Sequence, residues 1–484
     1  EAASFGEEID DPTVGLKAWT VCLRCGAIAP REEPRLCGCP PGTAHATLHE
    51  VEEAPNERRR RQRCVCCGAR NPNGTVFRML TGRDAPVSVL ATSLYQTLPP
   101  APDAEEGTSG QGRKLLSFAD SRQDAAFFAP YLEHTYGRIL ERRMLMGALD
   151  ADGNARSGCL RLDDLAPRLL SRAEEAGLFG PRASYDERHR TVRTWLMREL
   201  VSTAYRIGPE GLGLLHFRPV RPPRYAPPAV LLEPPWNLSP EEAWTVLQVL
   251  LDTLRRQGAV TFPEGVEPLD DAFKPRNVAV YVGEVANPNE RVLGWMPKRG
   301  SNGRLSYLVR LLVAAGLAEP AARDEAERAL QALWPYLVAP RSPWRAYVEP
   351  ANLRRAGTCY RLRHELWEWV PVETTGLPVY RCDGCGNVIY SSLRGICPTY
   401  NCRGTLRLLG DAEAEWRDNH YRHLYRALAP VGLAAEEHTA QWRPDKAGKV
   451  QDRFVRGEVN VLSCSTTFEL GVDVGTLQAV LMRN

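Results

Sequence analysis

The stretch VLSCSTTFELGVDVGTLQAVLM, residues 461–482, places a short polar loop between two apolar runs. The apolar runs predict two buried strands, at 459–462 and 477–482. Strands that end in polar, glycine-containing loops are typical of parallel α/β sheets, where ligands gather at the carboxyl ends of the strands. This stretch therefore predicts an α/β fold with a ligand-facing loop.

The loop itself offers groups that suit a nucleotide or a phosphate backbone. Ser465 and Thr466 supply hydroxyls and backbone N–H groups for phosphate, and Asp473 supplies a carboxylate for ribose hydroxyls. Gly471 would permit close approach of the backbone to a ligand. From spacing alone, however, a Thr-rich turn with Gly and Asp is more often ordinary turn chemistry.

The remaining α/β signals lie in two distant segments, 113–149 and 410–484. In the first, an apolar run at 114–118 is followed by Asp120 and Ser121, which are natural N-caps, and then by a long amphipathic pattern. In the second, helices are predicted at 416–428 and 447–456, with a strand entering EEHTAQ between them. We expect both segments to join one parallel sheet covered on both faces.

The residues between these segments have a mixed pattern. A helix is predicted after Ser239, with Pro240 at its first position, Glu242 closing a capping box and Gly258 ending it. Further helices are predicted at 304–315 and 322–334, each followed by strand-like pieces. Residues 150–370 are thus expected to form either a winged-helix-like insertion or a helical insertion of no special type.

Cysteine spacing predicts structural zinc in two places. The 14 cysteines include three CxxCG knuckles, in which the glycine lets the backbone curl around a metal. Cys382, Cys385, Cys397 and Cys402 form one predicted zinc ribbon within residues 371–409. Residues 1–80 hold a second set, and its predicted ligands are Cys22, Cys25, Cys64 and Cys67, with Cys37 and Cys39 as replacements for the second pair.

Composition narrows the class of protein. With 43% hydrophobic and 25% charged residues in 484, the chain is expected to be globular with several domains. A net charge of +2 gives no global basic field, so any nucleic-acid footprint would be local. The arginine cluster at 58–63 is one candidate, although such a run is usually a solvated face. No long apolar run predicts a membrane span and no signal peptide is evident, so a cytoplasmic location is expected.

Several of these segments resemble one protein family. FVRGEVNVLSCSTTFELGVDVGTLQAVLM is similar to motif V of superfamily 2 helicases, with Phe454 and Gly457 at its opening positions and Ser465 in place of the usual threonine. KLLSFADSRQDAAFFAPYLE resembles motif IV and its following helix. EEHTAQ falls where these enzymes contact the nucleic-acid strand. The combination most resembles large bacterial DEAD/DEAH-box DNA helicases of the DISARM and MrfA types.

The resemblance implies a second RecA-like lobe of an ATP-dependent motor that binds ATP, Mg²⁺ and DNA. The residues that it assigns to the nucleic-acid backbone are Ser121, Arg122, His438, Thr439, Gln441, Ser465 and Thr466. It assigns Glu469, Gly471 and Asp473 to the ATP site and its coupling to DNA.

The sequence also departs from the family pattern. It contains no GxxxxGK[ST] phosphate loop and no QxxGRxGR arginine-finger motif, and DAEE at 103–106 lies in the linker predicted for 81–112. We therefore expect a fragment that lacks its first RecA-like lobe and is inactive alone. The alternative is a non-catalytic, zinc-containing nucleic-acid-binding or scaffold protein with a RecA-like fold.

Overall fold

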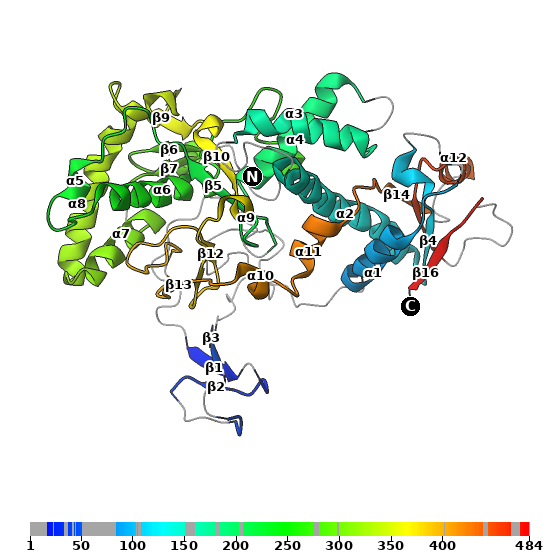
Figure 1. Ribbon diagram of the computed structural model, residues 1–484, viewed down its shortest axis with the longest axis horizontal. Coiled ribbons are helices and arrows are strands. Elements are labelled where there is room, and N and C mark those ends of the chain that lie inside the picture. Colours follow the sequence, from blue (N-terminus) through cyan, green and yellow to red (C-terminus); the bar gives the residue numbers. More distant parts are fainter. Residues whose placement is uncertain are drawn as a thin grey trace.

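The computed structural model spans the 484 residues. The residues that it describes are 17–22, 24–32, 37–40, 43, 45–50, 84–102, 104, 108–150, 160–179, 183–202, 207–273, 280–297, 300–400, 402–438, 444–465 and 475–483. They form an α/β structure, as the sequence predicted, with a parallel sheet at one end of an elongated body (Figure 1).

A four-stranded parallel sheet unites the two distant segments. Its strands, in spatial order, are β14 (Ala435–His438), β15 (Val461–Ser465), β4 (Leu115–Ala119) and β16 (Ala479–Arg483). Leu116 of β4 lies opposite Leu462 on one side and opposite Val480 on the other. The prediction that the two distant segments contribute neighbouring strands to one sheet is thus confirmed.

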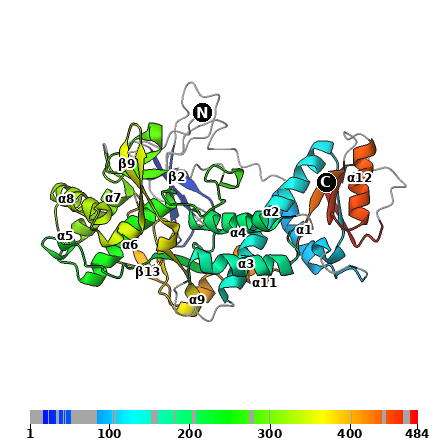
Figure 2. The same cartoon turned by 90° about the horizontal axis from the view of Figure 1, so that it is seen from above.

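Helices cover both faces of this sheet. Alternation along β4 sends Leu115 to one face and Leu116 to the other. On the first face, α2 (Arg122–Asp150) packs Phe128 and Leu132 into the large hydrophobic core that contains Leu115. On the second face, α12 (Pro444–Val455) packs over Leu116 and Leu462. Figure 2 shows the strands between α2 and α12.

One further helix joins α2 in contacting the segment that leads into β14. Tyr95 of α1 (Asp84–Thr97) and Tyr136 of α2 donate hydrogen bonds of 2.7 Å to the carbonyl oxygens of Gly432 and Val431. The segment predicted as a helix at 416–428 contains the shorter helix α11 (His420–Ala427), and a separate short helix, α10 (Ala412–Glu415), lies before it. Helix α11 begins after Asn419, whose side chain caps it by accepting a hydrogen bond from the Arg422 backbone.

The mixed region forms helices around small sheets. Its helices are α3 (Leu162–Glu175), α4 (Tyr185–Leu200), α5 (Ala229–Leu232), α6 (Pro240–Arg256), α7 (Gly303–Ala314), α8 (Glu319–Val338) and α9 (Val372–Thr375). Its strands are the antiparallel pair β5 (Leu215–Pro219) and β10 (Trp367–Pro371) and a mixed sheet of order β7-β6-β9-β8. The bounds of this sheet are β6 (Tyr281–Gly283), β7 (Val292–Gly294), β8 (Val348–Leu353) and β9 (Gly357–Leu362).

Local sequence signals place three of these helices, α6, α7 and α8, close to their observed bounds. The predicted capping box of α6 is present, since Ser239 and Glu242 exchange hydrogen bonds at its first turn. The two helices α7 and α8 are followed by the β8–β9 hairpin, which is the order of elements that suggested a winged helix. None of the described helices is both long and apolar enough to cross a membrane.

Candidate metal centres and sheet edge

The predicted C-terminal ribbon brings its four cysteines together. Strands β11 (Tyr380–Cys382), β12 (Val388–Ile389) and β13 (Leu406–Leu408) pair antiparallel in the order β12-β11-β13. Cys382 ends β11 and Cys385 lies on the turn that follows, where Gly386 has φ +72° and donates a 3.0 Å hydrogen bond to the Cys382 carbonyl. The left-handed conformation at Gly386 explains why glycine follows this knuckle.

The sulfur geometry suits zinc. The Sγ atoms of Cys382, Cys385, Cys397 and Cys402 all lie within 4.8 Å of one another. Tetrahedral coordination with Zn–S bonds of about 2.3 Å implies sulfur separations of about 3.8 Å. The Cys382–Cys402 and Cys385–Cys397 separations are 3.4 and 3.7 Å. The residues present therefore fit a closed, structural zinc site with four cysteine ligands.

Hydrogen bonds link the four thiols. The bond between Cys385 and Cys397 lowers the pKa of Cys385 and raises that of Cys397, so the two thiols share a proton. The backbone N–H groups of Gly384 and Gly404 also donate to the sulfurs of Cys382 and Cys402, at 3.4 and 3.3 Å. Such N–H···S contacts hold the sulfurs in place around a metal.

The N-terminal cluster assembles with the replacement ligands. Cys22, Cys25, Cys37 and Cys39 have their sulfurs within 4.8 Å of one another, so these four residues also fit zinc. Hydrogen bonds from the Cys25 and Arg24 backbone lower the pKa of Cys22. Cys64 and Cys67, the predicted second pair, lie outside the described residues. Within the described part, Cys37 and Cys39 take their place.

The two cysteine modules share one fold. Strands β1 (Ala18–Cys22), β2 (Ile28–Pro30) and β3 (His45–His49) pair antiparallel in the order β2-β1-β3, which matches β12-β11-β13. Gly26 has φ +73° and donates to the Cys22 carbonyl at 2.9 Å, as Gly386 does to Cys382. In both modules eleven residues separate the second cysteine from the third. We call them ribbon 1 (17–50) and ribbon 2 (378–410).

Three described residues of the predicted nucleic-acid site, Ser121, Arg122 and His438, lie at the sheet edge formed by the carboxyl ends of the parallel strands. Ser121 caps α2 by accepting a 3.0 Å hydrogen bond from the Asp124 backbone, and Arg122 is exposed at the first turn. His438 ends β14 and is partly buried, which lowers its pKa. The first turn of α2 leaves backbone N–H groups that favour an anion there.

Ser465 does not present its side chain at this edge. Strand β15 extends through Ser465, beyond the predicted end at residue 462, and the residue is fully buried. The extra ladder pairing with Ala119 draws Ser465 into the sheet. The other predicted site residues, namely Thr439, Gln441, Thr466, Glu469, Gly471 and Asp473, lie outside the described residues.

A buried charged cluster that sequence reasoning missed lies elsewhere, between α4 and β5. Arg255 is fully buried and contacts both Glu210 oxygens at 2.9 and 3.0 Å. Burial would raise the pKa of Glu210, but Arg255 and Arg256 hold it well below its usual range. Arg142 of α2 binds Glu199 of α4 at 2.8 Å. The sequence held no signal for these pairs, because each joins residues from separate elements.

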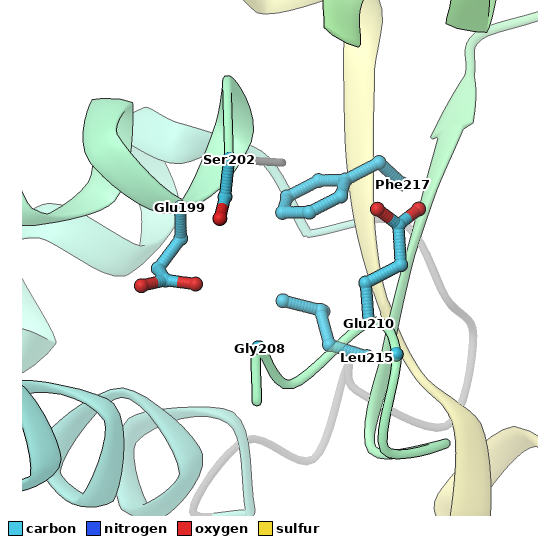
Figure 3. Close-up of a pocket in the computed structure, with 7 residues that line it drawn as sticks. Glu199, Ser202, Gly208, Glu210, Leu215 and Phe217 are labelled. Carbon is cyan, nitrogen blue, oxygen red and sulfur yellow. The ribbon is translucent and has the colours of Figure 1, made fainter. Parts of the chain in front are cut away.

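A cavity of about 10 Å³ beside this cluster has room for about one water molecule. Glu199 and Glu210 lie on opposite sides of it, with Phe217 across its top in Figure 3. Both carboxylates already have arginine partners. The cavity is therefore part of a structural network and not a substrate pocket.

Comparisons with known proteins identify no relative: no family model, no curated protein and no solved structure matches this chain.

Proposed function

We propose that the chain is the second RecA-like lobe of an ATP-dependent DNA helicase or translocase of superfamily 2, with a winged-helix-like insertion. One observation carries the proposal. Strand β4, from the segment that resembles motif IV, pairs with β15, from the segment that resembles motif V. Both strands run parallel, so the residues that follow them meet at one edge, as coupling between DNA and ATP would require.

In this proposal the edge grips one phosphate of a DNA strand. Arg122 is exposed and lies at the N-terminus of a 29-residue helix, so its guanidinium and the first-turn N–H groups would act together on an anion. His438 ends the next-but-one strand of the same sheet. Ser465 would act by anchoring the loop that follows it, because its own side chain is buried.

The ATP side is proposed from the resemblance and from position in the chain. Glu469, Gly471 and Asp473 follow β15 in the sequence. The sequence lacks the phosphate loop that would hold ATP and Mg²⁺, so the first lobe would supply it. The chain alone is then unable to hydrolyse ATP.

Zinc would have a structural role in both ribbons. Bound zinc would cross-link the two strand-loop segments of each ribbon, which are too small to fold by burial alone. Four cysteine ligands leave no open coordination position for a reacting water.

The two ribbons also support the second candidate, a non-catalytic zinc protein that binds nucleic acid or acts as a scaffold. In that case the sheet edge would be a binding surface without turnover. The presence of a phosphate loop and an arginine-finger motif in the same gene product would favour the motor.

Binding of single-stranded DNA tests the phosphate contact. We expect Arg122→Ala in the 484-residue chain to weaken binding and to reduce the slope of log affinity against log salt by about 0.7, which corresponds to one phosphate. Arg190→Ala, which removes an exposed arginine on α4, is the matched control. Unchanged affinity of the Arg122 variant at every salt concentration would show that the edge does not bind DNA.

ATP turnover tests the motor assignment. We expect no DNA-stimulated ATP hydrolysis by the purified 484-residue chain. In a gene product that also contains the first lobe, Asp473→Ala should reduce turnover at least about a hundredfold while DNA affinity changes little. Turnover by the chain alone would overturn the proposed division between lobes.

A further inference from the structure

The two ribbons can be matched residue by residue, because each has a glycine directly after its second cysteine and the same strand pairing. On this match Trp19 corresponds to Val379, Ile28 to Val388, Pro30 to Tyr390 and Leu48 to Leu409. These positions share one face of each ribbon sheet, since residues opposite each other in antiparallel strands point the same way.

In ribbon 2 this face is the attachment to the body. Val379, Val388 and Tyr390 are between 5% and 8% exposed and belong to the main hydrophobic core. The Tyr390 ring stacks on His216 at 4.5 Å between centroids, and its hydroxyl donates to the Glu210 carbonyl. An apolar surface of the same chain therefore covers this part of the face, whereas Arg381 and Arg407 on the same face are exposed.

In ribbon 1 the corresponding face carries apolar residues, of which Ile28 and Leu48 are exposed and the others partly buried. Trp19 lies opposite Pro30 and Leu48, and the next row along the strands contains only Val21, Ile28 and Ala46. Ile28 is 51% and Leu48 is 45% exposed. Among the described residues, no hydrophobic cluster includes this face, and in Figure 1 the strands β1–β3 stand apart from the body.

The small size of the face points to an occupant in the same chain. Strands of five, three and five residues give a sheet of about 17 by 10 Å. A stable contact between separate proteins needs about 800 Å² on each partner. A tether changes this balance, because linked surfaces meet at effective concentrations that can reach the millimolar range.

Helix α1 offers a complementary surface at the end of that tether. Residues 51–83 connect ribbon 1 to α1, and a chain of this length can span up to about 110 Å. Val89 and Leu90 of α1 are 45% and 60% exposed. After Asp84, α1 contains no charged residue, whereas a helix face exposed to water usually carries charges.

We propose that ribbon 1 docks through the face of Trp19, Ile28 and Leu48 onto the outer side of α1 at Val89 and Leu90, in the same chain. The docked ribbon would then lie close to the carboxyl ends of the parallel strands. This position follows because Asp84 pairs with Arg483 of β16, which also donates to the Asp124 carbonyl in the first turn of α2. The docking stands independently of the proposed helicase function.

Photo-crosslinking in the intact, zinc-loaded chain tests this contact. With p-benzoylphenylalanine in place of Leu90, we expect mass spectrometry to find cross-links to peptides of ribbon 1 within the same chain. The same probe in place of Tyr185, which is 71% exposed on α4, is the position control and should not give them.

A pair of charge variants identifies the face. Leu48→Glu should reduce the Leu90 cross-link at least about tenfold, because a carboxylate would have to enter an apolar contact. Thr47→Glu, on the opposite face of the same strand, should leave it unchanged, and both variants should retain their zinc.

Three outcomes would overturn the proposal. They are no cross-link from position 90 to ribbon 1, an equal loss in both charge variants, and cross-links mainly between light and heavy copies in an isotope mixture. The last result would indicate contact with a second copy instead.

Discussion

Ribbons 1 and 2 have the same strand order, the same CxxCG turn and the same four-sulfur cluster, yet only ribbon 2 is part of the hydrophobic core. The comparison separates two contributions to a small metal module. The turn and the sulfur positions come from a few local residues. The attachment to the body comes from the residues that face outward from the sheet.

Specific polar contacts reinforce the attachment of ribbon 2. Arg310 of α7 donates to the carbonyl oxygens of Thr399, which follows the third cysteine by two residues, and of Cys402, which is the fourth cysteine. Asn387 donates to the Thr399 hydroxyl at 3.0 Å, which links the turn to the same loop. Loss of metal from ribbon 2 should therefore disturb the body, whereas loss from ribbon 1 should disturb at most its proposed contact with α1.

Removing one ligand from each ribbon should give the largest contrast. Cys397→Ser and Cys37→Ser should each lower the zinc content by one ion per chain in elemental analysis. Only Cys397→Ser, at a fully buried site, should also lower the main calorimetric transition, by more than about 5 °C. Equal shifts in the two variants would mean that ribbon 2 is no better integrated than ribbon 1.

Matched apolar truncations should give a smaller contrast. Val388 and Ile28 occupy equivalent positions but are 8% and 51% exposed. Val388→Ala should lower the free energy of unfolding by about 1–3 kcal/mol, since it removes buried methyl groups. Ile28→Ala should have a smaller effect, because the proposed contact of ribbon 1 with α1 is small and lies at the surface. Denaturant unfolding followed by tryptophan fluorescence would measure both free-energy changes. A larger change for Ile28→Ala than for Val388→Ala would contradict the inferred difference between the two ribbons.

The contact between Tyr390 of ribbon 2 and His216 of the body should give the smallest effect, which is a dependence of stability on pH. Burial lowers the pKa of His216, which stacks on Tyr390 and faces Glu210, Asp252 and Arg255. The unfolded chain then binds a proton more readily, so stability should fall as pH drops below about 6.5.

Replacing the ring tests that dependence. His216→Asn should flatten the change in denaturation midpoint between pH 7 and 5, although the buried His364 contributes to the same slope. Thr47→Asn, on exposed β3 of ribbon 1, is the control and should leave the slope unchanged, because threonine carries no titratable group. If the His216 variant keeps the same dependence of its denaturation midpoint on pH, His216 does not contribute to the loss of stability at low pH.

Local signals predicted much of the architecture. Ser121, Ser239 and Glu242 cap helices where the sequence placed them, because a cap depends on residues within one turn. Strands β4, β15 and β16 of the parallel sheet were found from apolar runs of a few residues. Their ends were less accurate, since the pairing partner decides where a ladder stops, as Ser465 shows.

The candidate site was predicted in part. The C-terminal zinc ligands followed from spacing alone, because both pairs lie within one short segment. For the N-terminal cluster, spacing left two sets open, and the structure assembles the one with Cys37 and Cys39. The buried Arg255–Glu210 pair had no local signature, since its partners come from different elements.

The sequence by itself therefore determined the helix caps, the CxxCG turns and the apolar runs that became β4, β15 and β16, since each depends on short-range geometry or on burial of neighbouring residues. Only the tertiary structure decided that β4 lies between β15 and β16, that Ser465 is buried, and that one ribbon is packed while the other is open. Those outcomes depend on which distant surfaces exclude water from each other, and no local pattern in the chain records that choice.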